Sequence, residues 1–228
     1  MKPEQGQVSY GLPIHFLMAF CGGFFGSYAV FNRMSVFGNA QTANLIELIG
    51  AVLGHDFPDA LLRLGAFLVF VSALVLSVPL ERQLHRKAKY LTLAVEAAIA
   101  TAISFFPEDM NPIAAVYPIF FSAALQWSIF PGAEDFVAAN VFSTNNIKQT
   151  FTSLTEYVLE RKSNPERARE KLKKAICFGG TLLSFHCGVI SGFLGSRWLG
   201  IKSSLLCLIP LMIVWGLLRR EDRKKDES

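Results

Sequence analysis

Long apolar runs, separated by short polar and charged clusters, divide the 228-residue chain. Six of these runs are apolar on all faces and about as long as a helix that crosses the hydrocarbon core of a bilayer. The pattern therefore predicts an all-α, polytopic membrane protein with one integral membrane domain over residues 1–228. The six predicted spans cover residues 14–32, 60–80, 90–106, 112–130, 175–194 and 201–218.

Two polar clusters interrupt the apolar pattern at similar places. They begin the stretches "VFGNAQTANLIELI" (36–49) and "VFSTNNIKQTFTSL" (141–154). A short helical pattern follows each cluster, over residues 42–54 and 144–160. Thirteen helical residues rise about 20 Å, which is too short to cross a core of about 30 Å. Each segment is therefore either a half-helix that enters the membrane and runs back out, or an amphipathic helix in the headgroup region.

The order of segments repeats along the chain. The first half, about 12–106, and the second half, about 112–218, each contain a span, a polar cluster, a short helix and two further spans. A shift of 102 residues pairs Thr42 with Thr144 and Asn44 with Asn146, whereas a shift of 105 pairs the two Val-Phe dipeptides. Because each half has three spans, the halves are expected to insert in opposite directions, as a 3+3 inverted repeat.

Basic residues decide the expected orientation. The chain is 52% hydrophobic and 18% charged, and its lysines and arginines gather at 82–89, at 161–174 and in the tail 219–228. Cytoplasmic loops of membrane proteins are enriched in such residues, so both termini are expected in the cytoplasm. Because the net charge of +4 follows from these flanking clusters, we expect the lipid bilayer and no nucleic acid as a partner. A homodimer is also compatible with a chain of this length.

The two short helices provide a candidate binding site at their starts. A helix start carries unpaired N–H groups and partial positive charge, which small polar side chains or a bound anion can satisfy. We therefore expect a transporter or channel for a small polar or anionic solute; the alternative is a membrane scaffold or partner-binding protein without transport. The candidate substrate-binding residues are Thr42, Asn44, Thr144 and Asn146, with Gln41, Asn39, Asn145, Gln126 and Lys148 nearby.

Two ionisable residues lie inside predicted spans. Glu96 is a candidate carrier of a coupling proton, because an ionisable group at membrane depth is costly and commonly functional. The alternatives are pairing with Arg63 or with threonine and serine side chains, or a carboxyl group that stays protonated. His186 is a candidate in a proton relay, and the alternative is a neutral ring bonded to a neighbouring helix. Small residues at four-residue spacing in the fifth span predict close helix packing. They are Gly180, Ser184, Gly188 and Gly192.

Catalytic and metal-binding patterns are missing from the sequence. It contains none of the motifs HExxH, GxSxG, GxGxxG or the P-loop. Its four cysteines lie in apolar segments without metal-ligand spacing. We therefore expect neither an enzyme nor a metal or other cofactor.

The first polar cluster resembles a signature of the YoaK-like family, a set of uncharacterised bacterial membrane proteins. The family signature is similar to F-x-N-x-Q-T-G-N, and Phe37, Asn39, Gln41, Thr42 and Asn44 match it, with Ala43 in the usual glycine place. "TNNIK" (144–148) resembles the second family signature, and "LQWSIF" (125–130) resembles its glutamine-containing stretch. The resemblance implies a six-span protein of the bacterial inner membrane. It favours the 102-residue shift and supplies no substrate.

Overall fold

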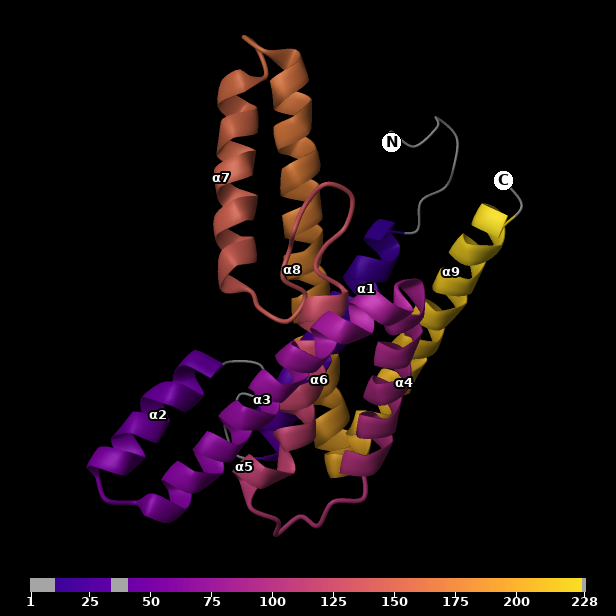
Figure 1. Ribbon diagram of the computed structural model, residues 1–228. Coiled ribbons are helices and arrows are strands. Elements are labelled where there is room, and N and C mark those ends of the chain that lie inside the picture. The colour runs from indigo at the N-terminus through magenta and orange to yellow at the C-terminus, as the bar shows by residue number, and fades with distance from the viewer. Residues whose placement is uncertain (1–10, 34–40, 227–228) are drawn as a thin grey trace.

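The computed structural model describes residues 11–33 and 41–226, and helices make up most of this part of the chain (Figure 1). The all-α prediction is confirmed. The helices are α1 (Gly11–Asn32), α2 (Gln41–Leu53), α3 (Phe57–Leu84), α4 (Arg86–Ile103), α5 (Pro112–Ala115), α6 (Tyr117–Ile129), α7 (Thr144–Glu160), α8 (Pro165–Leu199), the 3₁₀ helix η1 (Gly200–Cys207) and α9 (Leu208–Asp226).

Four helical stretches of the described chain are long and apolar enough to cross a membrane, where the sequence predicted six spans. They are Gly11–Asn32, Phe57–Leu84, Pro112–Ile129 and Pro165–Lys224. The last stretch contains both the fifth and the sixth predicted spans, and the chain reverses direction between α8 and α9 (Figure 1). α4, predicted as the third span, is helical but less apolar, because Glu96 and several threonines and lysines interrupt it. The result is a multi-pass helical membrane protein.

Short polar residues begin several helices. The side chain of Asp56 accepts a hydrogen bond from the backbone N–H of Asp59 at the start of α3, and Asn164 does the same for Arg167 at the start of α8. These bonds satisfy backbone donors that have no partner inside the helix. Gly200, at φ +55°, ends α8 in a conformation that side chains other than glycine rarely adopt. The chain can therefore reverse there and continue into η1.

α1 and α6 lie at the centre of the molecule, and most of their residues are buried. α1 packs against α8 and α9, whereas α6 packs against α3 and α4. Each central helix therefore contacts two helices that come from the other half of the chain. The main hydrophobic core is built largely from residues of α1, α3, α4, α6 and α9, and polar side chains are buried beside it.

Glycines bring α1 and α8 into close backbone contact. A Cβ at Gly188 would collide with the backbone carbonyl of Phe20, and one at Gly23 would collide with the carbonyl of Phe185. Gly192 is equally close to Ser27, whose hydroxyl bonds its own helix at Phe24. The predicted role of the small-residue strip in packing is thereby confirmed.

Candidate functional site

The two short helices, α2 and α7, each form the outer arm of an antiparallel helical hairpin (Figure 1). α2 pairs with α3, and α7 pairs with the first part of α8. The turn of each hairpin lies at its outer tip, so both short helices start toward the middle of the molecule and run outward. In Figure 1, α7 runs upward and α2 runs downward. This arrangement agrees with the predicted direction of the two helices.

α2 has its polar and apolar faces reversed relative to a helix of a water-soluble protein. Asn44 is its buried residue, at 4% exposure. Its isoleucines and the leucine at its end point away from the protein, with Ile46 at 66% and Leu53 at 75% exposure. In water such a face would be costly, whereas lipid tails are as apolar as the side chains.

α7 also buries polar residues, although its exposed side is mixed and includes Lys148 and Thr152. Its buried residues are Asn146 and Ser153, both at 0% exposure. Phe151 and Val158 lie on the face that points outward, at 61% and 51% exposure. The 102-residue shift that aligns the two polar clusters therefore pairs the buried asparagines of the two helices, Asn44 and Asn146.

The amide of Asn44 connects the start of α2 to α3. Its Nδ2 donates to the backbone carbonyl of Arg63 at 3.0 Å and to the side-chain oxygen of Gln41 at 3.2 Å. Its Oδ1 is buried and accepts no hydrogen bond from the described residues. Arg63 also forms ion pairs with Glu47 of α2 and Asp59 of α3, so it joins the two arms of the hairpin.

A second asparagine, Asn140, accompanies Asn146 at the start of α7. The Nδ2 of Asn146 donates to the carbonyls of Ala139 at 2.6 Å and Phe142 at 2.9 Å. The Nδ2 of Asn140 donates to the carbonyl of Phe130, the residue after α6, at 2.8 Å. The Oδ1 atoms of both asparagines are buried and without a partner in the described chain.

The loop that contains Asn140 packs directly on α1. A Cβ at Gly22 would collide with the backbone carbonyl of Asn140, so glycine is required at this crossing. One turn earlier on α1, the carbonyl of Met18 accepts a hydrogen bond from Nε2 of Gln126 at 2.8 Å. Gln126 and the loop at Asn140 therefore both contact the middle of α1, and Asn146 bonds that same loop. Non-helical backbone is enclosed by protein there.

The structure places the other predicted binding residues differently. Thr42, Thr144, Asn145 and Lys148 are exposed in the first turns of α2 and α7. Gln41 is half-buried and bonds Asn44, whereas the amide of Gln126 is used to hold α1. Asn39 lies outside the described residues. Each buried asparagine bonds within its own half, and no hydrogen bond among described residues joins Asn44 to Asn146.

The two ionisable residues inside predicted spans have different environments. Glu96 is 0% exposed, and neither of its carboxyl oxygens has a hydrogen-bond partner among the described residues. The alternative pairing with Arg63 is wrong, because Arg63 bonds Glu47 and Asp59. His186 is exposed on α8, and its Nδ1 lies 2.8 Å from the carbonyl of Leu182 on its own helix. The alternative bond to a neighbouring helix is also wrong.

Asn140 and Arg33 are among the buried polar residues that were not singled out from the sequence. Asn140 lies one residue before the second polar cluster. Its structural role depends on the contact of its backbone with Gly22, which is distant in sequence. Arg33 follows α1 and is 2% exposed. Its guanidinium donates to the carbonyls of Phe106, Pro107 and Glu108 after α4, at 2.7 to 3.4 Å. A single arginine close to a predicted span end was a signal for such a role.

Comparison with known proteins gives a family and no function. A family model described as "Protein of unknown function (DUF1275)" matches residues 14–217. Comparisons with curated proteins and with solved structures gave no match. The family match confirms the resemblance to an uncharacterised family.

Proposed function

The chain belongs to the DUF1275 family of proteins of unknown function, and from this premise we propose that it transports a small polar solute across the bacterial inner membrane. The observation that carries the proposal concerns α2 and α7, which both run outward from the middle of the molecule. Each of them buries an asparagine in its first turn, Asn44 in α2 and Asn146 in α7. The solute would bind where these helices start, and the two halves would move around it.

Reciprocal packing supports a 3+3 inverted repeat. α8 packs on α1 as α3 packs on α6, and α9 packs on α1 as α4 packs on α6. The hairpins α2–α3 and α7–α8 extend in different directions from the centre (Figure 1). Transporters built from inverted repeats bind their solutes at the interface of the repeats, close to the starts of broken helices.

The exposed apolar faces of α2 and α7 support entry into the membrane. A helix that lies in the headgroup region directs its charged face to water and its apolar face to lipid. Here the buried side chains are asparagine and serine, whereas Ile46, Leu53 and Phe151 are exposed on the outward side beside some polar residues. The basic α7–α8 tip and the basic end of α9 support both termini in the cytoplasm, since the two point the same way (Figure 1).

The chemistry at the helix starts favours a solute that both donates and accepts hydrogen bonds. The Oδ1 atoms of Asn44, Asn140 and Asn146 are buried acceptors without a partner among the described residues. A buried polar atom without a hydrogen bond is costly, so a solute donor would be stabilised there. The N–H groups in the first turns of α2 and α7 are available to solute acceptors. Glu96, buried and unpartnered, is the residue we propose for carrying a coupling proton.

A ligand-dependent stability assay tests the proposal. The melting temperature of detergent-purified protein would be measured against a panel of amino acids, nucleobases, sugars and small anions, because a ligand of the folded state raises it. We expect a compound that stabilises the parent but not the Asn44→Ala or Asn146→Ala variants. Ser204→Ala is the matched control: its hydroxyl bonds the carbonyl of Ala100, away from both short helices, so this variant should lose stability and keep the ligand-induced shift. Radiolabelled uptake of that compound into proteoliposomes then measures transport.

A scaffold without transport is the second candidate. It is favoured by the apolar lining of the principal cavities among the described residues and by the local bonding of the asparagine amides. This function predicts no shift with any compound, together with strong destabilisation of both asparagine variants. That combination would reject the transport proposal.

A further inference from the structure

An elongated gap separates α4 from α9, although the two helices are joined at both ends of it. At one end, the hydroxyl of Ser204 in η1 donates to the carbonyl of Ala100 at 2.7 Å. At the other end, the rings of Tyr90 and Trp215 pack edge to face at 4.9 Å, and the Tyr90 hydroxyl donates to Asp222 at 2.6 Å. The gap between these joints is therefore a fixed feature of the fold.

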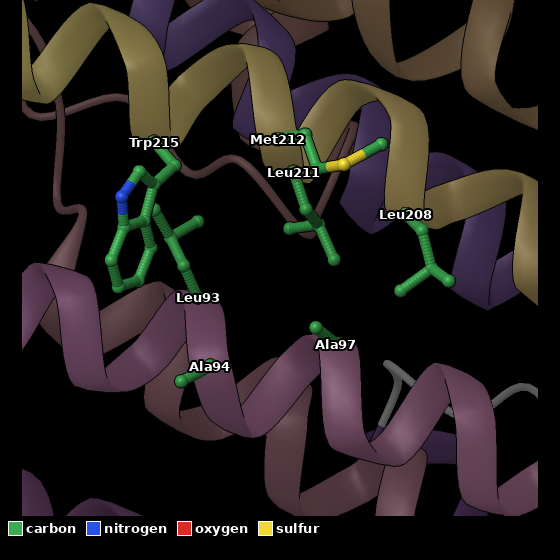
Figure 2. A pocket seen from close by; sticks show the side chains of 7 residues that line it. All are labelled: Leu93, Ala94, Ala97, Leu208, Leu211, Met212 and Trp215. Carbon is green, nitrogen blue, oxygen red and sulfur yellow. The ribbon is translucent and has the colours of Figure 1, made fainter.

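The gap forms a cavity of about 440 Å³ with an apolar lining (Figure 2). Ala97 on α4 faces Leu208 and Leu211 on α9 across it, and Trp215 lies at one end beside Leu93 (Figure 2). Small alanines opposite large side chains leave space that no side chain of the described protein fills. The occupant must therefore be apolar and elongated.

Positive charge continues the line of the groove beyond Trp215. Arg219 and Arg223 follow Trp215 at four-residue intervals and therefore lie on the same face of α9. On α4, Lys87 lies one turn before Tyr90 on the corresponding side. Lys87, Arg219 and Arg223 are exposed.

The acidic residues near this end are already paired with a different cation. Arg86 bonds Asp222 at 2.7 Å and Glu221 at 3.3 Å. The charge presented next to the groove is therefore positive. An aromatic pair between an apolar groove and basic residues is the arrangement expected at a membrane–water interface.

We propose that this groove binds an anionic phospholipid from the leaflet on the basic side of the protein. One acyl chain lies between α4 and α9, and the phosphate contacts Arg219, Arg223 and Lys87. Basic clusters beside membrane helices attract anionic headgroups, and an apolar groove alone would not select among lipids. A second copy of the chain fits less well, because pairing two such faces would bring their arginines together.

Native mass spectrometry of the detergent-purified protein tests the proposal with two lipids of identical chains, phosphatidylglycerol and phosphatidylcholine. We expect retention of phosphatidylglycerol in preference to phosphatidylcholine. The double variant Arg219→Gln/Arg223→Gln should weaken phosphatidylglycerol binding about tenfold. Arg161→Gln/Lys162→Gln removes the same charge at the α7–α8 tip and should leave binding unchanged. Ala97→Leu should displace the acyl chain and reduce retention of both lipids.

Three results would overturn the proposal. They are equal retention of the two lipids by the parent, equal weakening by the two double variants, and unchanged lipid retention in Ala97→Leu. A change of dimer fraction in Ala97→Leu with unchanged lipid retention would assign the groove to an interface between copies. Melting temperatures of all variants show whether each is folded. If Ala97→Leu is not folded, the smaller substitution Ala97→Val replaces it in the assay.

Discussion

The hairpins α7–α8 and α2–α3 have the same arrangement of helices. However, α8 packs more closely on α1 than α3 packs on α6. α8 meets α1 through glycines, with backbone against backbone. α3 meets α6 mainly through side chains, including Tyr117, whose hydroxyl donates to the carbonyl of Leu62 at 2.6 Å. The comparison indicates that α7–α8 is the fixed partner of the core and α2–α3 the more easily displaced one.

The starts of the two short helices also differ in the contacts that their buried asparagines make with the described residues. Asn146 is covered by the loop that Asn140 ties to the end of α6 and that packs on Gly22. Asn44 contacts one backbone carbonyl of α3 and one side chain of its own helix. Both asparagines are buried, and among the described residues more backbone covers Asn146 than Asn44. The predictions below address this difference, beginning with the largest expected effect.

A backbone contact between α1 and α8 gives the largest expected effect. Gly188→Ala should lower the free energy of unfolding by about 3 kcal/mol, because the added methyl group collides with the carbonyl of Phe20 and overpacks the interface. The measurement is denaturant unfolding in detergent. Gly216→Ala is the control, since no atom lies within 4 Å of its Cβ position. Equal stability of the two variants would contradict the tight α1–α8 contact.

The asparagine variants should separate the two helix starts. Asn146→Ala should cost about 2 kcal/mol, since it leaves two carbonyls without this donor, whereas Asn44→Ala should cost about 1 kcal/mol. The same unfolding assay measures both. A larger loss in Asn44→Ala would reverse the expected order of the two helix starts.

The α3–α6 contact should tolerate change better than the α1–α8 contact. Gly65→Ala would place a methyl group against the end of the Tyr117 side chain, which can move at the expense of its bond to Leu62. We expect a loss of about 1 kcal/mol, the usual size of one hydrogen bond. Tyr117→Phe removes the same bond without added volume and should give a similar loss. A loss as large as that of Gly188→Ala would show equal tightness of the two hairpins.

Acid should weaken the α7–α8 hairpin slightly. The hydrogen bond from Lys171 lowers the pKa of Glu156 below its ordinary value of 4.5. A lowered pKa in the folded state stabilises the protein above pH 4.5, and this contribution is lost as the pH falls through the lower value. Melting temperatures above and below pH 4.5 should therefore differ less in Glu156→Gln than in the parent. Because the pair is exposed, the difference should be small.

The sequence predicted the helical segments, the packing strip and the pair of asparagines, because each has a local signal. Apolar run length gives the spans, four-residue spacing of glycines gives close packing, and Asn44 and Asn146 each follow a threonine at a helix start. The roles of Asn140 and Arg33 could not be predicted from such local signals. Their roles depend on contacts with Gly22 and with the end of α4, which are distant in sequence.

The exposed threonines show a second limit of sequence reasoning. Thr42 and Thr144 have the polarity expected of site residues, but helical phase places them outward and the asparagines two residues later inward. Polarity alone does not tell which face of a membrane helix is covered by protein. The partners α3 and α8 decide it, and they follow later in the chain.

The central claim is that α2 and α7 run outward to opposite sides of the membrane, and labelling of the two hairpin tips tests it most directly. His55→Cys and Lys162→Cys would each be made in a chain whose four native cysteines are replaced by alanine. A membrane-impermeant maleimide would then be applied to intact spheroplasts and to inside-out vesicles. The account predicts labelling of the position-55 thiol in spheroplasts only and of the position-162 thiol in inside-out vesicles only. Labelling of both tips from the same side would contradict the inverted arrangement.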